Sequence, residues 1–169
     1  LGRILSIGTT EQAVYWIREY IDGEALSLRL ERQHLDEQAL VQLALRLARV
    51  LSAIHRRGLI HRGLQAGNII LDAEGHAWLL DLGVCPPGSH ATNVENPKAF
   101  RDAVRYQAPE MAGLLQCPVD HRADLYSLGV VLYLAATGKH PFEAEALSDL
   151  VQQHASSSPK PIQVANPEL

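Results

Sequence analysis

The segment from Ile60 to Leu71, with the residues that follow it, constrains the fold more than any other part of this 169-residue chain. A polar loop is followed by a short apolar run, Ile69 to Leu71, and by a turn that Gly75 closes. A second apolar run then extends from His76 to Leu80. Two apolar runs separated by a glycine-containing turn predict an antiparallel hairpin.

The ends of this hairpin carry Asn68, just before the first strand, and Asp81, just after the second. Because a hairpin brings its two ends together, we expect these side chains to lie side by side. An amide oxygen next to a carboxylate is a pair of hard ligands suited to Mg²⁺, which takes one or two protein ligands together with phosphate and water. The sequence therefore predicts a magnesium site at Asn68 and Asp81.

At these residues the chain resembles a protein kinase, whose catalytic loop reads H-R-D-x-x-x-x-N and whose metal-binding motif reads D-F-G. Here the loop is His61-Arg62-Gly63 with Asn68 in register, and the second motif is Asp81-Leu82-Gly83. The chain also has the A-P-E motif at Ala108-Pro109-Glu110. The stretch Asp124 to Gly129 is similar to the start of the family's buried central helix. Four motifs in the family's order make this resemblance specific.

The resemblance implies a protein kinase-like fold of the α+β class, mainly helical, to which the chain contributes the C-terminal (large) lobe and a remnant of the small-lobe sheet. We expect residues 1–22 to be remnant small-lobe strands and hinge, residues 23–155 the helical large lobe, and residues 156–169 a polar tail or linker. Strand-forming side chains are concentrated at 3–7 and 13–21. Because the chain begins at Leu1 and not at Met, we also expect it to be a fragment of a longer protein.

The resemblance further implies binding of ATP and Mg²⁺. The backbones of Glu19 and Ile21 are expected to hydrogen-bond the adenine edge, with Ile70 beneath the ring and Arg18 at the back of the pocket. The residues alone also fit a plainer interpretation, in which the first strands form a hairpin with an exposed end and Ile70 packs in the core. The family's Gly-rich loop and strand Lys are not found in this chain, so we expect the chain by itself to bind ATP weakly or not at all.

Three positions depart from the family. The Asp that accepts the substrate hydroxyl proton is replaced by Gly63, which has no side chain to act as a base. The Lys expected two residues later, which steadies the transferred phosphate, is Gln65, and the Thr before A-P-E is Ala103. Base catalysis contributes on the order of 10²–10⁴ in rate. The resemblance therefore identifies Arg62, Gly63 and Gln65 as catalytic-loop positions in a site whose activity is lost or altered.

Apolar side chains at three- and four-residue steps predict a helix from Leu35 to Arg57, capped by Asp36 and ended by Gly58. A second helix, from Asp120 to Thr137, is apolar nearly all round and so is predicted to be buried. Within it Asp124 is a lone carboxylate that needs hydrogen-bond donors, and the family uses this Asp to hold the catalytic-loop backbone. Shorter helices are predicted at 24–30 and 143–154.

The stretch from Val84 to Gln107 shows little periodicity and contains several prolines, so we predict a long loop in the place of the activation segment. Ser89 and Thr92 are candidate phosphorylation sites there, with Arg62 as a possible phosphate partner. The alternative is that both residues are ordinary solvated hydroxyls.

Composition excludes several classes of function. A net charge of −4 gives no indication of nucleic-acid binding, and no apolar run is long enough to cross a membrane. The two cysteines, Cys85 and Cys117, form neither a disulfide framework nor a zinc spacing, which favours a cytoplasmic location. Cys85 is either a reactive thiol near the nucleotide pocket or an inert packing residue. The eight histidines show no metal-ligand spacing.

Three functions remain open. The first is a pseudokinase that works through protein contacts and retains nucleotide and Mg²⁺ binding. The second is an active Ser/Thr protein kinase with an altered site, which transfers the γ-phosphate of ATP to protein hydroxyls. The third is a small-molecule phosphotransferase of kinase-like fold, against which the A-P-E motif and the Asp124 helix count. The partner is accordingly a protein substrate or a regulatory protein.

Overall fold

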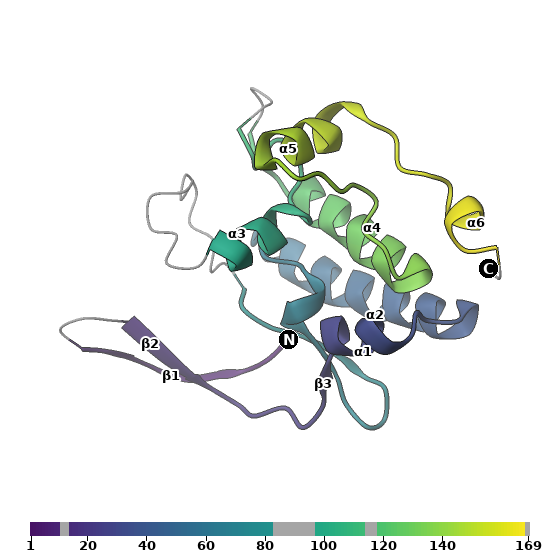
Figure 1. Ribbon diagram of the computed structural model, residues 1–169. Helices are drawn as coiled ribbons and strands as arrows, with labels where there is room; N and C mark the ends of the chain where they lie inside the picture. Colours follow the sequence, from purple (N-terminus) through teal and green to yellow (C-terminus); the bar gives the residue numbers. More distant parts are fainter. Residues whose placement is uncertain (11–13, 83–96, 114–117, 168–169) are drawn as a thin grey trace.

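The structure is a computed structural model that describes residues 1–10, 14–82, 97–113 and 118–167. The strands are β1 (Ile4–Thr9), β2 (Val14–Arg18), β3 (Glu24–Ala25), β4 (Ile69–Leu71) and β5 (Ala77–Leu79). The helices are α1 (Leu26–Arg32), α2 (Glu37–His55), α3 (Pro97–Val104), α4 (Arg122–Thr137), α5 (Leu147–Ser156) and α6 (Ile162–Ala165). The described part is therefore mainly helical with two small antiparallel sheets, which confirms the predicted fold class (Figure 1).

Strands β1 and β2 pair antiparallel and extend away from the helical part of the molecule (Figure 1). Both strands lie within or next to the two predicted stretches, but β1 extends two residues further, to Thr9, and β2 ends three residues earlier, at Arg18. Several large apolar side chains of this hairpin are more than half exposed, among them Ile4, Leu5 and Ile7. The hairpin therefore contributes little to the main core.

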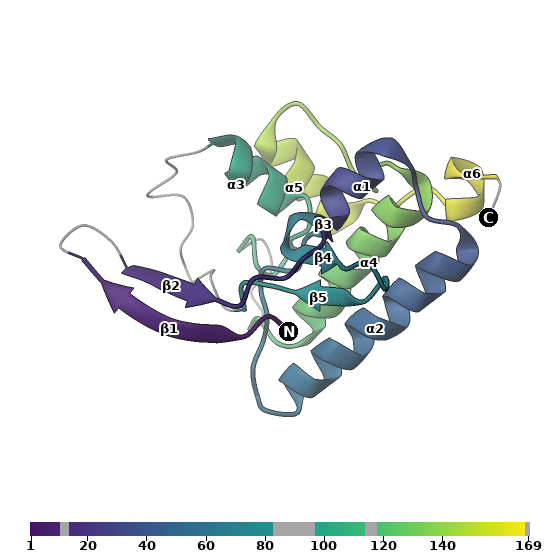
Figure 2. The ribbon, with the colours of Figure 1, turned by 90° about the horizontal axis from the view of Figure 1, so that it is seen from below.

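The second sheet has the order β3-β4-β5 and lies beside α2 (Figure 2). The predicted hairpin is confirmed, with Ile70 paired to Trp78 and Gly75 at a φ of +74° in the turn. The predicted helix at 24–30 is wrong at its start, because Glu24 and Ala25 form β3 and pair with Leu71 and Ile70. Pairing with an existing strand satisfies their backbone groups, and α1 begins only at Leu26.

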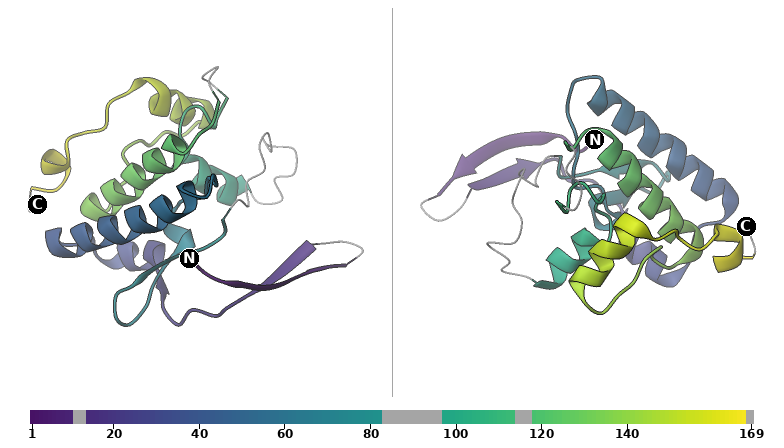
Figure 3. Two further views of the ribbon diagram at one scale, coloured as in Figure 1. Left: turned by 180° about the vertical axis from the view of Figure 1, so that it is seen from behind. Right: turned by 90° about the horizontal axis from the view of Figure 1, so that it is seen from above.

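The core lies between α2, α4 and the second sheet (Figure 3). Helix α2 buries Leu43, Leu47, Leu51 and Ile54, which are spaced at three- and four-residue steps and belong to the predicted apolar stripe. Asp36 caps this helix, since its carboxylate accepts the N–H of Ala39 at 2.8 Å. Helix α4 is mostly buried but begins two residues later than predicted, with His121 in the cap position, and Leu125 is half exposed.

A second, smaller core joins α3 to α5 and corrects the predicted long loop. Helix α3 occupies residues 97–104, where Phe100 and Val104 face Phe142 and Leu150. Two apolar side chains four residues apart, preceded by Pro97 at the first helical position, are sufficient for a short helix once a partner surface is available. Helix α5 begins at Leu147, four residues later than predicted.

Residues 156–169, for which we predicted no regular structure, contain α6. The Asn166 side chain next to it is buried, and its Nδ2 donates to the carbonyl of Ala136 at the end of α4, at 2.7 Å. A tertiary hydrogen bond, not an apolar pattern, therefore holds this segment. In the described part of the chain no helix has the length and apolar character needed to span a membrane.

Candidate functional site

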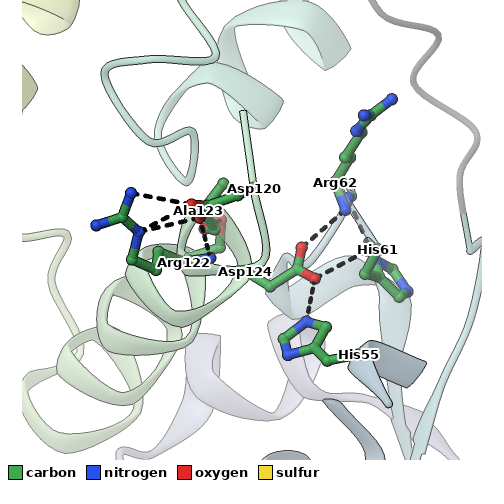
Figure 4. Close-up of polar contacts among 9 residues, drawn as sticks. His55, His61, Arg62, Asp120, Arg122, Ala123 and Asp124 are labelled. Carbon is green, nitrogen blue, oxygen red and sulfur yellow. Dashed lines mark hydrogen bonds and ion pairs between the residues drawn. The ribbon is translucent and has the colours of Figure 1, made fainter. Parts of the chain in front are cut away.

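Asp124 on α4 holds the loop that contains His61 and Arg62 (Figure 4). Its Oδ2 accepts the backbone N–H of His61, and its Oδ1 accepts that of Arg62, both at 2.8 Å. The same Oδ2 lies 2.7 Å from Nε2 of His55, at the end of α2. Asp124 is 1% exposed, and three partners compensate for the burial of its charge. The predicted need of this carboxylate for donors is confirmed.

His61 is completely buried and braces the loop from within. Its Nε2 lies 3.0 Å from the carbonyl oxygen of Leu80, and its Nδ1 accepts the N–H of Gly63 at 3.2 Å. This arrangement requires the neutral tautomer with the proton on Nε2. Burial lowers the pKa of His61, although the nearby Asp124 charge opposes that shift. His61 therefore links the loop to the strand that leads to Asp81.

Asn68 follows the loop and closes it. Its Nδ2 donates to the carbonyl of Gly63 at 2.9 Å. Because this bond uses the amide nitrogen, Oδ1 is the atom of Asn68 that could serve as a metal ligand. The backbone carbonyl of Asn68 accepts the N–H of Leu80 at 2.8 Å, which continues the pairing of β4 and β5 up to Asp81.

Asn68 and Asp81 line one hollow of about 280 Å³, as the hairpin prediction required. Arg62, Gly63, Gln65 and Ala103 line the same hollow, so the structure brings together every catalytic-loop position predicted from the sequence. The remaining lining residues are Leu64, Tyr106, Gln107 and Ser127. The sequence had not indicated a role for these four residues at the site.

Tyr106 and Ser127 also line the hollow. Ser127 Oγ donates to the carbonyl of Tyr106 at 2.8 Å, which ties α4 to the segment before Ala108. Burial raises the pKa of the Tyr106 phenol to about 12. The phenol therefore remains a neutral group across the physiological range and cannot replace the base missing at Gly63.

Gly63 is not required by the shape of the loop. A Cβ built on it would lie 3.6 Å from the backbone oxygen of Asp81 and 3.8 Å from Nδ2 of Asn68, which are ordinary contact distances. Its φ also lies outside the left-handed region. The backbone therefore accepts a residue with a side chain at position 63, and the absence of a carboxylate here is not imposed by the shape of the loop.

In the described part of the chain, the two non-glycine residues with positive φ are Arg62, at +60°, and Asp81, at +61°. Such conformations cost free energy and persist only where the surroundings impose them. Both residues line the hollow. Backbone strain is thus concentrated at the site.

Asp81 also has a partner that the sequence did not predict. Nη1 of Arg18, the last residue of β2, lies 2.9 Å from Oδ1 of Asp81. From the sequence we expected Arg18 at the back of the nucleotide pocket but predicted no contact between Arg18 and Asp81. The pairing depends on how two segments 63 residues apart are placed, which local sequence patterns do not report.

Other predicted residues lie elsewhere. Glu19, Ile21 and Ile70 are not among the described residues that line the hollow. The N–H of Glu19 donates to the carbonyl of Arg3 at 2.9 Å. Gly83, the two cysteines and the candidate phosphorylation sites Ser89 and Thr92 lie outside the described residues.

The turn between β4 and β5 gathers Asp72, Glu74 and His76, whose ligand atoms lie within 4.8 Å of one another. From the sequence we found no metal-ligand spacing among the histidines and so missed this group, in which one histidine lies next to two carboxylates. The Asp72 carboxylate already accepts the N–H of His76 at 2.7 Å and Nε1–H of Trp78 at 2.9 Å. The hydrogen bond from Trp78 is the main cause that lowers the pKa of Asp72. These bonds account for the cluster as a stabilised turn.

Comparison with known proteins supports the arrangement just described. Residues 2–168 match the family model described as "Protein kinase domain". The chain belongs to the protein kinase family. Residues of three of the four kinase motifs line the hollow of this kinase domain: Arg62, Gly63 and Asn68 from the catalytic loop, Asp81 from the metal-binding motif, and Ser127 from the start of the central helix.

Among curated proteins, this kinase domain is 33% identical over 173 residues to "Serine/threonine-protein kinase pkn2" of Myxococcus xanthus, covering 99% of the chain and 20% of that protein. It is 29% identical over 152 residues to a probable serine/threonine-protein kinase of Clostridium perfringens, covering 89% of the chain and 22% of that protein. It is 33% identical over 144 residues to "Protein kinase C epsilon type" of Rattus norvegicus, covering 85% and 19% respectively. The chain thus spans about a fifth of the length of these relatives.

Proposed function

We propose that this kinase domain works through binding and not through phosphate transfer: a pseudokinase whose scaffold is intact and whose reacting groups are absent. The observation that carries the proposal is Gly63. It occupies the position of the catalytic Asp and lines the hollow beside Asn68 and Asp81, yet it offers no group that can accept a proton. Gln65 and Ala103 remove a cation and a hydroxyl from the same hollow.

The scaffold supports a retained binding role. Phosphate transfer depends mainly on positioning and on electrostatic stabilisation, and positioning is what Asp124, His61 and Asn68 provide through their bonds to the loop. A loss of rate on the order of 10²–10⁴ is expected from the missing base alone. The domain would then act by binding protein partners, and nucleotide binding would regulate that interaction.

The chemistry of the hollow is compatible with Mg²⁺. An amide oxygen from Asn68 and a carboxylate oxygen from Asp81 are the hard ligands that this ion takes. When bound, Mg²⁺ would neutralise charge on the phosphates of ATP. Asn68 and Asp81 would hold the ion. Glu19, Ile21 and Ile70 are proposed to contact the adenine ring of ATP, as the resemblance implies. We expect weak ATP binding by this chain alone, which an affinity in the micromolar range by calorimetric titration would contradict.

The proposal is tested by measuring phosphate transfer from labelled ATP to generic Ser/Thr protein substrates, with the full-length protein. We expect no transfer above the background of an Asp81→Asn control. Transfer at an ordinary kinase rate that Asp81→Asn abolishes would overturn the proposal.

The second candidate is an active Ser/Thr kinase with an altered site, and the intact loop scaffold favours it. The two candidates differ in their response to Gly63→Asp. An altered but working site has another route for the proton, so the new carboxylate would add little. A site that has lost its reacting groups would gain transfer from Gly63→Asp made together with Gln65→Lys and Ala103→Thr.

A further inference from the structure

The most unusual contact of the site is the ion pair between Arg18 and Asp81. It joins the last residue of β2 to the residue that follows the hairpin, with Nη1 and Oδ1 2.9 Å apart. The Arg18 side chain is 43% exposed and that of Asp81 28% exposed. The guanidinium therefore lies on Asp81, the one carboxylate among the described residues that line the hollow.

The backbone on both sides places Arg18 at this carboxylate. Arg18 pairs with Ile4 in the first sheet, and the next residue, Glu19, donates its N–H to Arg3. The start of the chain is in turn attached to the second sheet, because the N–H of Gly2 donates to the carbonyl of Leu79 at 2.9 Å. Leu79 lies two residues before Asp81. Regular hydrogen bonding thus carries Arg18 to Asp81, and the pair does not depend on a flexible side chain alone.

A guanidinium and a divalent cation compete for the same oxygen. Both are attracted by the Asp81 carboxylate, and like charges within about 4 Å repel each other strongly at the effective dielectric of a protein surface. Mg²⁺ would therefore have to displace Arg18 or share the carboxylate with it. Either event reduces the affinity of the hollow for the metal.

We infer that Arg18 acts as a resident cation that neutralises Asp81 and weakens divalent-metal binding at Asn68 and Asp81. The inference rests on the proposed role of Asp81 as a metal ligand. It adds a specific prediction, that metal affinity in this domain is limited by a side chain of β2 and not by a defective ligand pair. Removing the guanidinium should then expose a competent metal site.

The test is a titration of the full-length protein with Mn²⁺ in the absence of nucleotide. Binding is measured as the decrease of the electron paramagnetic resonance signal of free Mn²⁺. Mn²⁺ accepts the same oxygen ligands as Mg²⁺. Arg18→Met should bind Mn²⁺ about threefold to tenfold more tightly than the unchanged protein, the range expected for releasing one partly exposed ion pair and its charge. Arg18→Lys retains the charge and should gain less.

Two controls make the result specific. Arg32→Met removes an exposed arginine that pairs with Glu24 at 2.6 Å, away from the residues lining the hollow, and should leave Mn²⁺ affinity unchanged. Adding Asp81→Asn to Arg18→Met should remove the gain.

Equal Mn²⁺ affinity in Arg18→Met and the unchanged protein, including no measurable binding by either, would overturn the inference. So would a gain that survives Asp81→Asn. Because no nucleotide or phosphate acceptor is present, the result is independent of whether the domain transfers phosphate.

Discussion

Asp124 accepts the backbone N–H of Arg62 at 2.8 Å, across 62 residues of chain. This bond connects the buried helix α4 to the loop in which Gly63 replaces the expected base. A carboxylate that holds backbone is retained, while the carboxylate that would react is absent. The loop thus keeps its structural anchor at a place where Gly63 offers no carboxylate.

The first prediction concerns that anchor. Asp124→Ala should lower the free energy of unfolding by about 3 kcal/mol or more, because it leaves the buried donors of His61 and Arg62 without their acceptor. The measurement is chemical denaturation. Asp120→Ala is the matched control: this carboxylate pairs with Arg122 at the same end of α4 but is 38% exposed, so its loss should cost clearly less than the loss of Asp124. Equal effects of the two changes would contradict the anchoring role of Asp124.

The second prediction uses two glycines of different kinds. Gly63→Ala should change the free energy of unfolding by about 0.5 kcal/mol or less, since the new Cβ meets ordinary contacts. Gly23→Ala should destabilise by about 1–3 kcal/mol, because its Cβ would lie 2.5 Å from the carbonyl oxygen of Leu71. Thermal unfolding of both variants checks this difference. A larger loss at Gly63 would show that the loop needs glycine for its shape.

The third prediction concerns acid stability and His140. Burial, with a smaller contribution from the Arg105 charge, lowers the pKa of His140 to about 4 from 6.5 in the unfolded chain. Between these values the unfolded state binds a proton that the folded state does not. The contribution of His140 to the free energy of unfolding is therefore fully present above pH 6.5 and is lost as the pH falls toward 4.

His140→Gln should consequently flatten the dependence of unfolding free energy on pH in that interval. The matched control is His34→Gln, at an exposed position, which should leave the steepness unchanged. Denaturation at a series of pH values measures both. An unaltered slope in His140→Gln would contradict the assignment.

Periodic patterns made much of the fold predictable. The apolar stripe and Asp36 cap located α2 to within two residues at each end, and Gly75 located the β4–β5 turn. The same hairpin argument correctly brought Asn68 and Asp81 to one hollow. Each of these inferences depended on a signal carried by neighbouring residues.

The elements that were missed depend on distant partners. Helix α3 has two large apolar side chains, Phe100 and Val104, and the surface that stabilises it comes from Phe142 and Leu150. The segment at α6 is held by Asn166, whose partner carbonyl on Ala136 lies 30 residues away. Arg18 reaches Asp81 only because strand pairing places it there. None of these partners can be identified from local composition.

The central claim is that the site lacks a base but not a scaffold, and one ratio tests it: the rate of phosphate transfer by a variant with Gly63→Asp, Gln65→Lys and Ala103→Thr, divided by the rate of the unchanged protein. Both rates are measured with the full-length protein, Mg-ATP and a generic Ser/Thr substrate. With the Asp81→Asn background taken as the lowest measurable rate, the account predicts a ratio on the order of 10² or more, the usual contribution of a positioned base. A folded triple variant that is no faster than the unchanged protein, including the case in which neither exceeds that background, would contradict it.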